Sequence, residues 1–327
     1  MSEPKHDGIL KYEPSLVGNA ALGAIYAIEG FLFLYYITRH KDKWALCLPI
    51  GALASAAGFF LRLMMDPDNF KLTLYIAQQA LVVISPSAFL AFNYMLYGRF
   101  IIAIDPEFGV DKVQSRSEKS RYSFIPPRIV GRTFVWSDAI TFFIQMAAGG
   151  LQASGAKNNP SLSIMGDKMF LVGVSAQGVS YCLFTTLLTV AVRRLIKEKQ
   201  RTRVAQQKQS WLGLDRDTTV IVGSFYVSSL LIIIRSIYRV VEFTQGYQGE
   251  LISKEIYLFV LDAVLLVLAI GVWAINWPTV LLSRIAVQVR EETQAYIMEK
   301  VNKGSVIGIY FLDSHLTEPE ELEMIPD

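Results

Sequence analysis

Seven long apolar runs, separated by short charged segments, constrain the fold of this chain more than any other feature of its sequence. Each run is about 20 residues long, the length of an α-helix that crosses the hydrocarbon core of a bilayer. Transmembrane strands would instead be about ten residues long, with strict alternation of apolar and polar residues. The sequence therefore predicts an all-α, polytopic integral membrane protein with seven transmembrane helices. The expected spans are about 17–37, 44–64, 72–97, 133–153, 169–192, 218–238 and 255–276.

The composition excludes several functional classes. Only 18% of the 327 residues are charged, against roughly 25% in soluble globular proteins, and a net charge of +2 gives no reason to expect a nucleic-acid partner. All three histidines lie outside the apolar runs, so we expect no metal or haem held by histidines within the membrane, and we predict no cofactor. The sequence has no Gly-x-x-x-x-Gly-Lys-Ser/Thr loop, so ATP-driven pumping by this chain alone is not expected.

The positive charges predict the orientation in the membrane. Loops on the cytosolic side carry an excess of Lys and Arg. With the N-terminus outside, 22 of the 31 Lys and Arg lie in the four cytosolic segments, which are 38–43, 98–132, 193–217 and the tail after residue 276. The sequence therefore predicts an outside N-terminus and a cytosolic C-terminus. The expected parts are an extracellular 1–16, a helix bundle over 17–278, and a cytosolic helix with an acidic tail over 279–327.

Three segments carry more local expectations. The basic stretch 193–208 lacks Gly and Pro, so we expect it to prolong the fifth helix, either as a topology anchor or as a contact for anionic lipids. A further helix is expected near 283–302. Pro86 lies within the third span and is expected to break or kink that helix.

A group of ionisable residues marks the sixth and seventh spans. Arg235, Arg239 and Glu242 have helical spacing and share one face. The seventh span begins at Glu255, and Asp262 follows two turns later on the same face, about 10 Å deeper. Charged groups within a membrane are costly and default to a functional hypothesis. Two interpretations stay open: a salt-bridge network that locks the two helices together, and a polar cavity that receives the head of a ligand.

Other polar residues lie inside the remaining spans. Asp138 is expected to pair with Arg99 or Arg132, with a cationic ligand as the alternative, and Gln145 lies seven residues on and shares its face. Gln78 and Gln177 are favoured as partners in hydrogen bonds between helices. The full set of candidate ligand-binding residues is Asp262, Glu242, Arg235, Arg239, Gln145, Gln177, Asp138, Gln78 and Arg62.

Motifs along most of the chain resemble those of one family. They are Tyr12-x-Pro14-Ser15 with Asn19; Gly51, Gly58 and Arg62; Pro86, Ala88, Tyr94, Gly98 and Arg99; Phe134-Val135, Asp138, Gln145 and Gly149-Gly150; Gly173 and Gln177; and Arg235-x-x-x-Arg239-x-x-Glu242 with Gly246, Gly249, Glu255 and Asp262. This pattern resembles the fungal lipid-translocating exporters, a family that includes 7-aminocholesterol-resistance proteins and sphingoid long-chain-base exporters. The chain departs from the family at Ser55, where a glutamate is common, and at Asn276-Trp277-Pro278, where the family has His-Pro-Gly.

The resemblance implies a plasma-membrane protein of a fungus that moves or binds an amphipathic lipid, such as a sphingoid base, a sterol-like molecule or a phospholipid. A sphingoid base carries an amine, and our hypothesis places Asp262 and Glu242 against it, with Gln145 and Gln177 adding hydrogen bonds. Arg235 and Arg239 would better suit a phosphate or carboxylate, so anionic phospholipid or porphyrin ligands stay open.

Two further functional classes are a receptor or sensor and an enzyme. A seven-helix receptor or sensor shares the topology, but the third span ends in Tyr97-Gly98-Arg99 rather than Asp/Glu-Arg-Tyr. An enzyme is not expected, because the sequence shows no histidine cluster or nucleophile motif. The expected partners are an amphipathic lipid ligand and the surrounding membrane lipids, and a homodimer is one open alternative.

Overall fold

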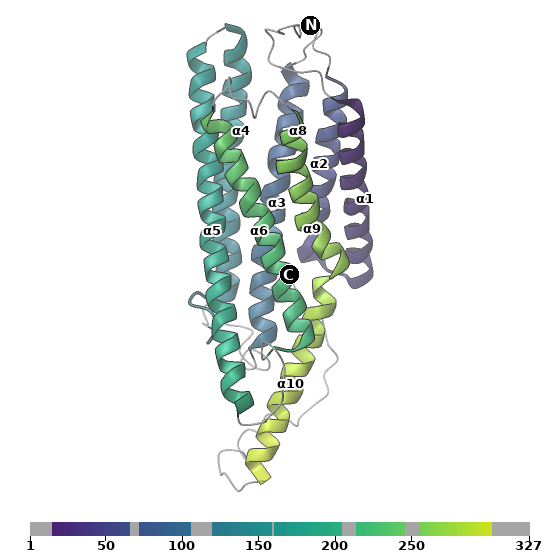
Figure 1. Cartoon of the computed structure of the whole chain (residues 1–327), viewed down its shortest axis with the longest axis vertical. Coiled ribbons are helices and arrows are strands. Elements are labelled where there is room, and N and C mark those ends of the chain that lie inside the picture. Colours follow the sequence, from purple (N-terminus) through teal and green to yellow (C-terminus); the bar gives the residue numbers. More distant parts are fainter. Residues whose placement is uncertain are drawn as a thin grey trace.

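The computed structural model describes residues 15–65, 72–105, 120–158, 160–204, 214–245 and 255–302. All regular elements in these ranges are helices, and they stand roughly side by side as a tall bundle (Figure 1). They are α1 (Leu16–His40), the 3-10 turn η1 (Lys43–Leu46), α2 (Cys47–Leu63), α3 (Leu72–Ile104), α4 (Pro127–Asn158), α5 (Pro160–Val204), α6 (Arg216–Thr244), α8 (Glu255–Leu258), the π-helical segment η4 (Phe259–Val264), α9 (Leu265–Ile275) and α10 (Pro278–Asn302). The motif residues Gly246 and Gly249, the first 14 residues and the acidic tail lie outside the described residues.

Seven helices are long and apolar enough to span a membrane, which confirms the predicted fold class. Their bounds are Leu16–His40, Lys43–Leu63, Thr73–Ile104, Pro127–Gln152, Ser161–Gln200, Arg216–Thr244 and Glu255–Ile275. The orientation of the termini and the division into three parts stay predictions.

The spans form a closed ring in chain order. Each packs against the next, and the seventh, built from α8, η4 and α9, packs against both α6 and α1. The last helix, α10, lies against α3 and α6 and leaves the bundle at the end away from α8 (Figure 1).

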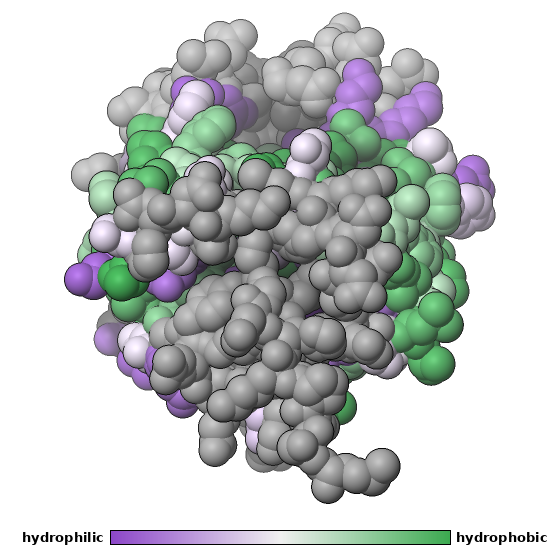
Figure 2. All heavy atoms as spheres, turned by 90° about the horizontal axis from the view of Figure 1, so that it is seen from above, coloured by the Kyte–Doolittle hydropathy of each residue, from purple (hydrophilic) through white to green (hydrophobic). Residues whose placement is uncertain are grey.

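The outer faces of the bundle are apolar. Large hydrophobic side chains stand exposed on several helices, such as Ile28 (67%), Phe143 (68%), Val179 (61%) and Ile237 (58%). Hydrophobic residues also form much of the visible perimeter when the molecule is seen end-on (Figure 2). A soluble monomer rarely exposes so much continuous apolar surface, whereas lipid covers it in a membrane protein.

Aromatic side chains fill much of the core. The ring centroid of Trp273 on α9 lies 5.6 Å from Phe92 on α3 and 5.3 Å from Phe225 on α6. A second aromatic group joins α3 to α5, where the centroids of Tyr94 and Phe184 are 4.7 Å apart in an edge-to-face arrangement. Such pairs add to the free energy gained by close packing. The polar groups discussed below are therefore held in a well-packed apolar surrounding.

Two local expectations have clear outcomes. The fifth helix continues through the basic stretch as far as Val204, as predicted, while residues 205–208 of that stretch lie outside the described residues. The third helix runs unbroken through Pro86 from Leu72 to Ile104, so of the expected break or kink the break does not occur, and the kink stays a prediction. Directly before Pro86, the hydroxyl of Ser85 donates to the carbonyl of Leu81 at 2.9 Å, a local hydrogen bond of the kind that accommodates proline in membrane helices.

Candidate functional site

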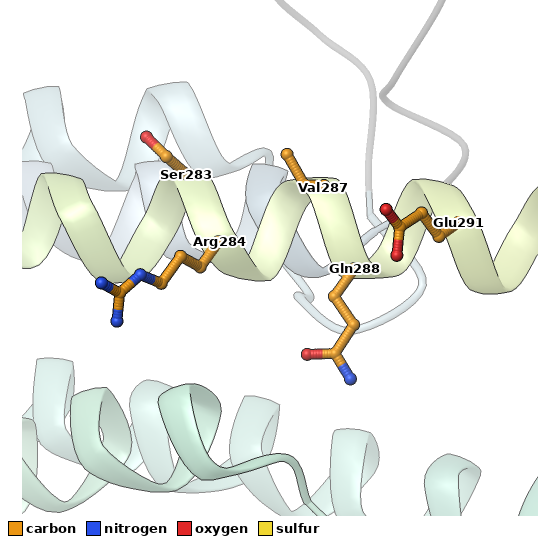
Figure 3. Close-up of a pocket in the computed structure, with 5 residues that line it drawn as sticks. All are labelled: Ser283, Arg284, Val287, Gln288 and Glu291. Carbon is orange, nitrogen blue, oxygen red and sulfur yellow. The ribbon is translucent and has the colours of Figure 1, made fainter.

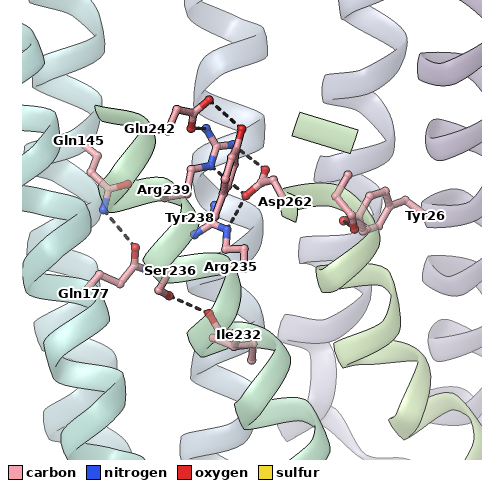
Figure 4. A network of polar contacts seen from close by, with 11 residues as sticks. Tyr26, Gln145, Gln177, Ile232, Arg235, Ser236, Tyr238, Arg239, Glu242 and Asp262 are labelled. Atoms are coloured by element: carbon pink, nitrogen blue, oxygen red, sulfur yellow. Dashed lines mark hydrogen bonds and ion pairs between the residues drawn. The ribbon is translucent and has the colours of Figure 1, made fainter. Parts of the chain in front are cut away.

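Asp262 is the centre of a buried ion-pair network between α6 and η4. Its Oδ1 accepts from Nε of Arg235 at 2.6 Å and from Nε of Arg239 at 2.9 Å, and its Oδ2 accepts from Nη2 of Arg239 at 2.5 Å (Figure 4). The paired contact with Arg239 is the fork-to-fork geometry in which arginine binds a carboxylate most strongly. One acid of the seventh span thus holds two arginines of the sixth.

Glu242 completes this network and neutralises it. Its Oε2 accepts from Nη1 of Arg239 at 3.0 Å, and its Oε1 accepts from the hydroxyl of Tyr238 at 3.1 Å. The two arginines and two acids carry no net charge together, and each is only 4–8% exposed. The predicted salt-bridge network is confirmed. The ligand-binding role of these four residues stays a prediction.

The seventh span is not a regular α-helix where Asp262 lies. Six residues form a π-helical segment, Phe259–Val264, which has more residues per turn than an α-helix. The expectation that Glu255 and Asp262 share a face is therefore wrong: Asp262 meets α6, whereas Glu255 meets α1 and α2. On the α1 side, the hydroxyl of Tyr26 donates to the carbonyl of Ala263 at 2.8 Å.

Glu255 forms a separate polar contact at the start of the seventh span. It accepts from the backbone N–H of Ser15 at 2.7 Å and from Nδ2 of Asn19 at 2.8 Å, and it lies 3.5 Å from Nε of Arg62. These contacts tie the first, second and seventh spans together. The structure thus places Arg62 in an ion pair well apart from Arg235 and Arg239.

The amide side chains link the third, fourth and fifth spans. Nε2 of Gln145 donates to Oε1 of Gln177 at 3.1 Å (Figure 4), and Nε2 of Gln177 donates to the hydroxyl of Ser87 at 3.0 Å. The prediction that Gln177 bonds between helices is confirmed. Gln78 is buried on α3.

The contact between α4 and α5 has a repeat of seven residues, which we call the α4–α5 seam. Polar residues on α4 stand opposite small residues on α5, in the antiparallel pairs Asp138–Ser180, Gln145–Gly173 and Gln152–Gly166. A Cβ added at Gly173 would lie 2.7 Å from Cγ of Gln145, and one at Gly166 would lie 2.8 Å from Cγ of Gln152. Small residues let membrane helices approach closely, and here they accommodate polar side chains from the opposite helix.

Two of the three seam positions are satisfied by hydrogen bonds and one is not. Gln152 donates to Asp167 at 2.8 Å, and Gln145 donates to Gln177 as described. At the third position, neither carboxyl oxygen of Asp138 makes a hydrogen bond of regular geometry with a described residue, although Asp138 is only 2% exposed and two hydroxyls lie close enough to interact with it. An ion pair of Asp138 with a basic residue was expected and is not found. Arg99 instead stacks over the ring of Trp44, 4.7 Å from its centroid, and Arg132 is exposed.

Two hydroxyls face the carboxyl of Asp138, one from each neighbouring helix. They belong to Tyr94 on α3 and Ser180 on α5, and both interact with the carboxyl, although neither makes a hydrogen bond of regular geometry. We call Asp138, Tyr94 and Ser180 the Asp138 cluster. Four of the ten unpartnered buried atoms in the described part of the chain belong to these three residues. Buried polar groups are nearly always satisfied, so such a concentration leaves room for a further polar partner, such as an ordered water, an ion or a ligand.

Sequence reasoning found Asp138 but not its two neighbours as site residues. Ser180 continues the seven-residue repeat that begins at Gly166 and Gly173, which is a signal that could have found it. Tyr94 is one of the motif residues of the third span, but its contact with Asp138 depends on how α3 is rotated against α4.

A shallow hollow also lies beside α10, with a volume of about 470 Å³. Its lining comes from this one helix and consists of Ser283, Arg284, Val287, Gln288 and Glu291 (Figure 3). It is apart from every residue predicted to bind a ligand, and we assign it no role.

Comparison with known proteins identifies the family to which the chain belongs. Residues 48–285 match the family described as RTA1 like protein. Three similar proteins come from Saccharomyces cerevisiae: Protoporphyrin uptake protein 1 (27% identity; 69% of this chain and 66% of that protein), Protein RTA1 (28%; 85% and 78%) and Sphingoid long-chain base transporter RSB1 (26%; 46% and 45%). The match thus spans less than two thirds of the first and third of these relatives. No solved structure matches the chain.

The family model covers most of the bundle, from the start of the second span into α10, and it includes both the ion-pair network and the α4–α5 seam. The predicted family is therefore confirmed, because the resemblance seen in the sequence was to this same group of proteins. The chain is an integral membrane protein of seven candidate spans that belongs to the RTA1-like family.

Proposed function

We propose that the protein binds an amphipathic lipid with a cationic head and moves it across the membrane, with the head group at the Asp138 cluster. The observation that carries this proposal is the buried carboxyl of Asp138, which has no basic partner among the described residues and is faced by the hydroxyls of Tyr94 and Ser180. A primary ammonium has three N–H donors, and the cluster offers one acceptor from each of three helices. A relative named as a sphingoid long-chain base transporter supports a ligand with such a head.

For the same reason, we propose that the amine contacts Asp138 and not Asp262 and Glu242. Both acids are already paired with arginines, so an ammonium would have to displace a guanidinium to reach either one. Removing one partner of a buried pair costs about 3–5 kcal/mol. Asp138 presents no such competitor, since no described basic residue pairs with it. Gln145 and Gln177 lie further along the same seam and are proposed to line the route of the head group.

The cluster is closed in the conformation that the structure describes. Asp138, Tyr94 and Ser180 are 2%, 0% and 8% exposed. A ligand therefore reaches the carboxyl only if α4 separates from α3 or α5. A transporter needs such a movement, because its site must open to one side of the membrane at a time.

Reconstitution tests the proposal. Purified full-length protein in liposomes should carry a fluorescent long-chain amine from one leaflet to the other, and Asp138→Asn should reduce the initial rate at least tenfold. Asp167→Asn is the matched control, because Asp167 lies on the same seam but already accepts from Gln152. Equal rates in empty and protein-containing liposomes would contradict the proposal.

A second class, the receptor or sensor, stays open as an alternative. It would bind the amine without moving it, so the same liposomes would show saturable binding and no transfer. An anionic ligand is a further alternative, because one relative is named as a protoporphyrin uptake protein. Location in the plasma membrane and the absence of enzymatic activity are predictions.

A further inference from the structure

The described residues include one buried acid without a counter-charge and another that has two. Asp262 has two arginines, and Glu242 has Arg239 and the hydroxyl of Tyr238. In the described part of the chain, the titratable groups that interact with Asp138 are uncharged: Tyr94 on α3 and Tyr181 on α5. Tyr181 is itself occupied, since its hydroxyl contacts Asn93 and Ser229.

Charge balance restricts what can occupy the Asp138 cluster. An ionised carboxylate in the middle of a membrane protein is costly unless a positive charge accompanies it. The cluster is electrically neutral when it holds one positive charge, and two carriers fit: the ammonium of the ligand and a proton on the carboxyl itself. A metal ion fits less well, because hard cations take six or more oxygen ligands and the cluster supplies three side chains on regular helices.

We propose that Asp138 exchanges one proton for one cationic head group, so that lipid movement is coupled to proton movement in the opposite direction. In the empty site the carboxyl carries the proton and can donate it in a hydrogen bond to the hydroxyl oxygen of Tyr94 or Ser180. When the ammonium enters, the O–H bond breaks, the proton leaves to water, and the carboxylate pairs with the ammonium. The site is neutral in both states, so neither state leaves a bare charge in the bundle.

This inference rests on the proposed function and adds its source of energy. The network at Asp262 is already neutral without a ligand, because its two acids are paired with two arginines, so it needs neither a proton nor a cationic ligand to balance its charge. Among the described residues, Glu29 on α1 is the other span carboxyl with an unpartnered buried oxygen, but it is only half-buried, and the hydroxyl of nearby Tyr26 already donates to the carbonyl of Ala263. Asp138 is therefore the group at which a proton and a cationic ligand would compete.

One-for-one exchange gives a quantitative expectation. A pH difference of one unit across the membrane is a tenfold ratio of protons, so it can sustain up to about a tenfold ratio of the cationic lipid between the leaflets. The amine should accumulate on the more acidic side, because it moves against the flow of protons. Without a pH difference, movement should stop when the two leaflets are equal.

The test uses liposomes of neutral phosphatidylcholine that contain the full-length protein, a trapped pH-sensitive dye and a fluorescent long-chain amine. We expect lipid accumulation and a simultaneous pH change of the lumen for the wild type. Asp138→Asn should abolish both coupling signals, Asp138→Glu should restore part of them, and Glu29→Gln and Asp167→Asn should retain them. Size-exclusion profiles and thermal unfolding establish that each variant is folded.

Each outcome bears on one claim. Lipid transfer that is the same with and without a pH gradient, and that leaves the lumen pH unchanged, would overturn proton exchange and leave the proposed function standing. Coupling that persists in folded Asp138→Asn protein would overturn the assignment of the proton to Asp138. No lipid transfer under any gradient would overturn the proposed function and, with it, this inference.

Discussion

Replacing Asp262 by Asn should be the most damaging single change in the ion-pair network. The substitution keeps the shape of the side chain but leaves two buried arginines with only Glu242 between them. Asp262 makes three contacts of 2.5–2.9 Å with these arginines, and it is 4% exposed. Breaking a buried pair by removing one partner costs about 3–5 kcal/mol. At about 2–4 °C for each kcal/mol, the midpoint of thermal unfolding should fall by roughly 6–20 °C.

A double variant tests whether Asp262→Asn lowers stability through the unbalanced charge that it leaves. Arg235→Met together with Asp262→Asn leaves Arg239 and Glu242 as a neutral pair, so the double variant should unfold at a higher temperature than Asp262→Asn alone. The two changes should couple by about 0.5–3 kcal/mol in a double-mutant cycle. Asp167→Asn serves as a control, since it changes one acid that has a single amide partner and should cost below about 1 kcal/mol.

Unfolding of purified protein in detergent, followed by tryptophan fluorescence, measures these differences. Two results would refute the assignment of Asp262 as the counter-charge of two arginines. One is an Asp262→Asn protein that is as stable as the wild type. The other is a double variant whose loss of stability equals the sum of the losses in the two single variants.

Three further variants test other contacts. Glu255→Gln should lower stability by about 1.5–3 kcal/mol, because it removes a charged acceptor shared by Ser15, Asn19 and Arg62; an unchanged unfolding midpoint would contradict this. Gly173→Ala should lower stability by about 1–3 kcal/mol, because the new Cβ would lie 2.7 Å from Cγ of Gln145. Gly150→Ala is the control and should leave stability unchanged, because its Cβ would meet nothing within 4 Å. Equal effects of the two substitutions would contradict the close approach of the helices at the α4–α5 seam.

The sequence allowed the bundle to be predicted because hydropathy depends on composition and not on packing. Runs of about 20 apolar residues require helices in a membrane, since every backbone polar group must be satisfied within the segment. The spacing of Arg235, Arg239 and Glu242 likewise follows from helical geometry, and the structure confirms that they share one network. The hydrogen bond from Gln145 to Gln177 fits the rule that amide side chains in membrane helices form hydrogen bonds with neighbouring helices.

The errors lie where tertiary packing decides the outcome. The π-helical segment Phe259–Val264 turns Asp262 away from the face of Glu255, and six mostly apolar residues carry no compositional sign of such a segment. Similarly, the partners of Asp138 depend on the rotation of three helices about their own axes. Charge alone suggested Arg99 or Arg132, but Arg99 stacks on Trp44, and Tyr94 and Ser180 face the acid instead.

A structure of the protein in lipid nanodiscs with a long-chain amine tests the central claim most directly. We expect the amine nitrogen within hydrogen-bonding distance of the Asp138 carboxyl, with Tyr94 and Ser180 as its other neighbours, and Asp262 still bound to Arg235 and Arg239. An amine bound at Asp262 or Glu242 with its arginines displaced, or held only on the outer surface of the bundle, would contradict the assignment of the site.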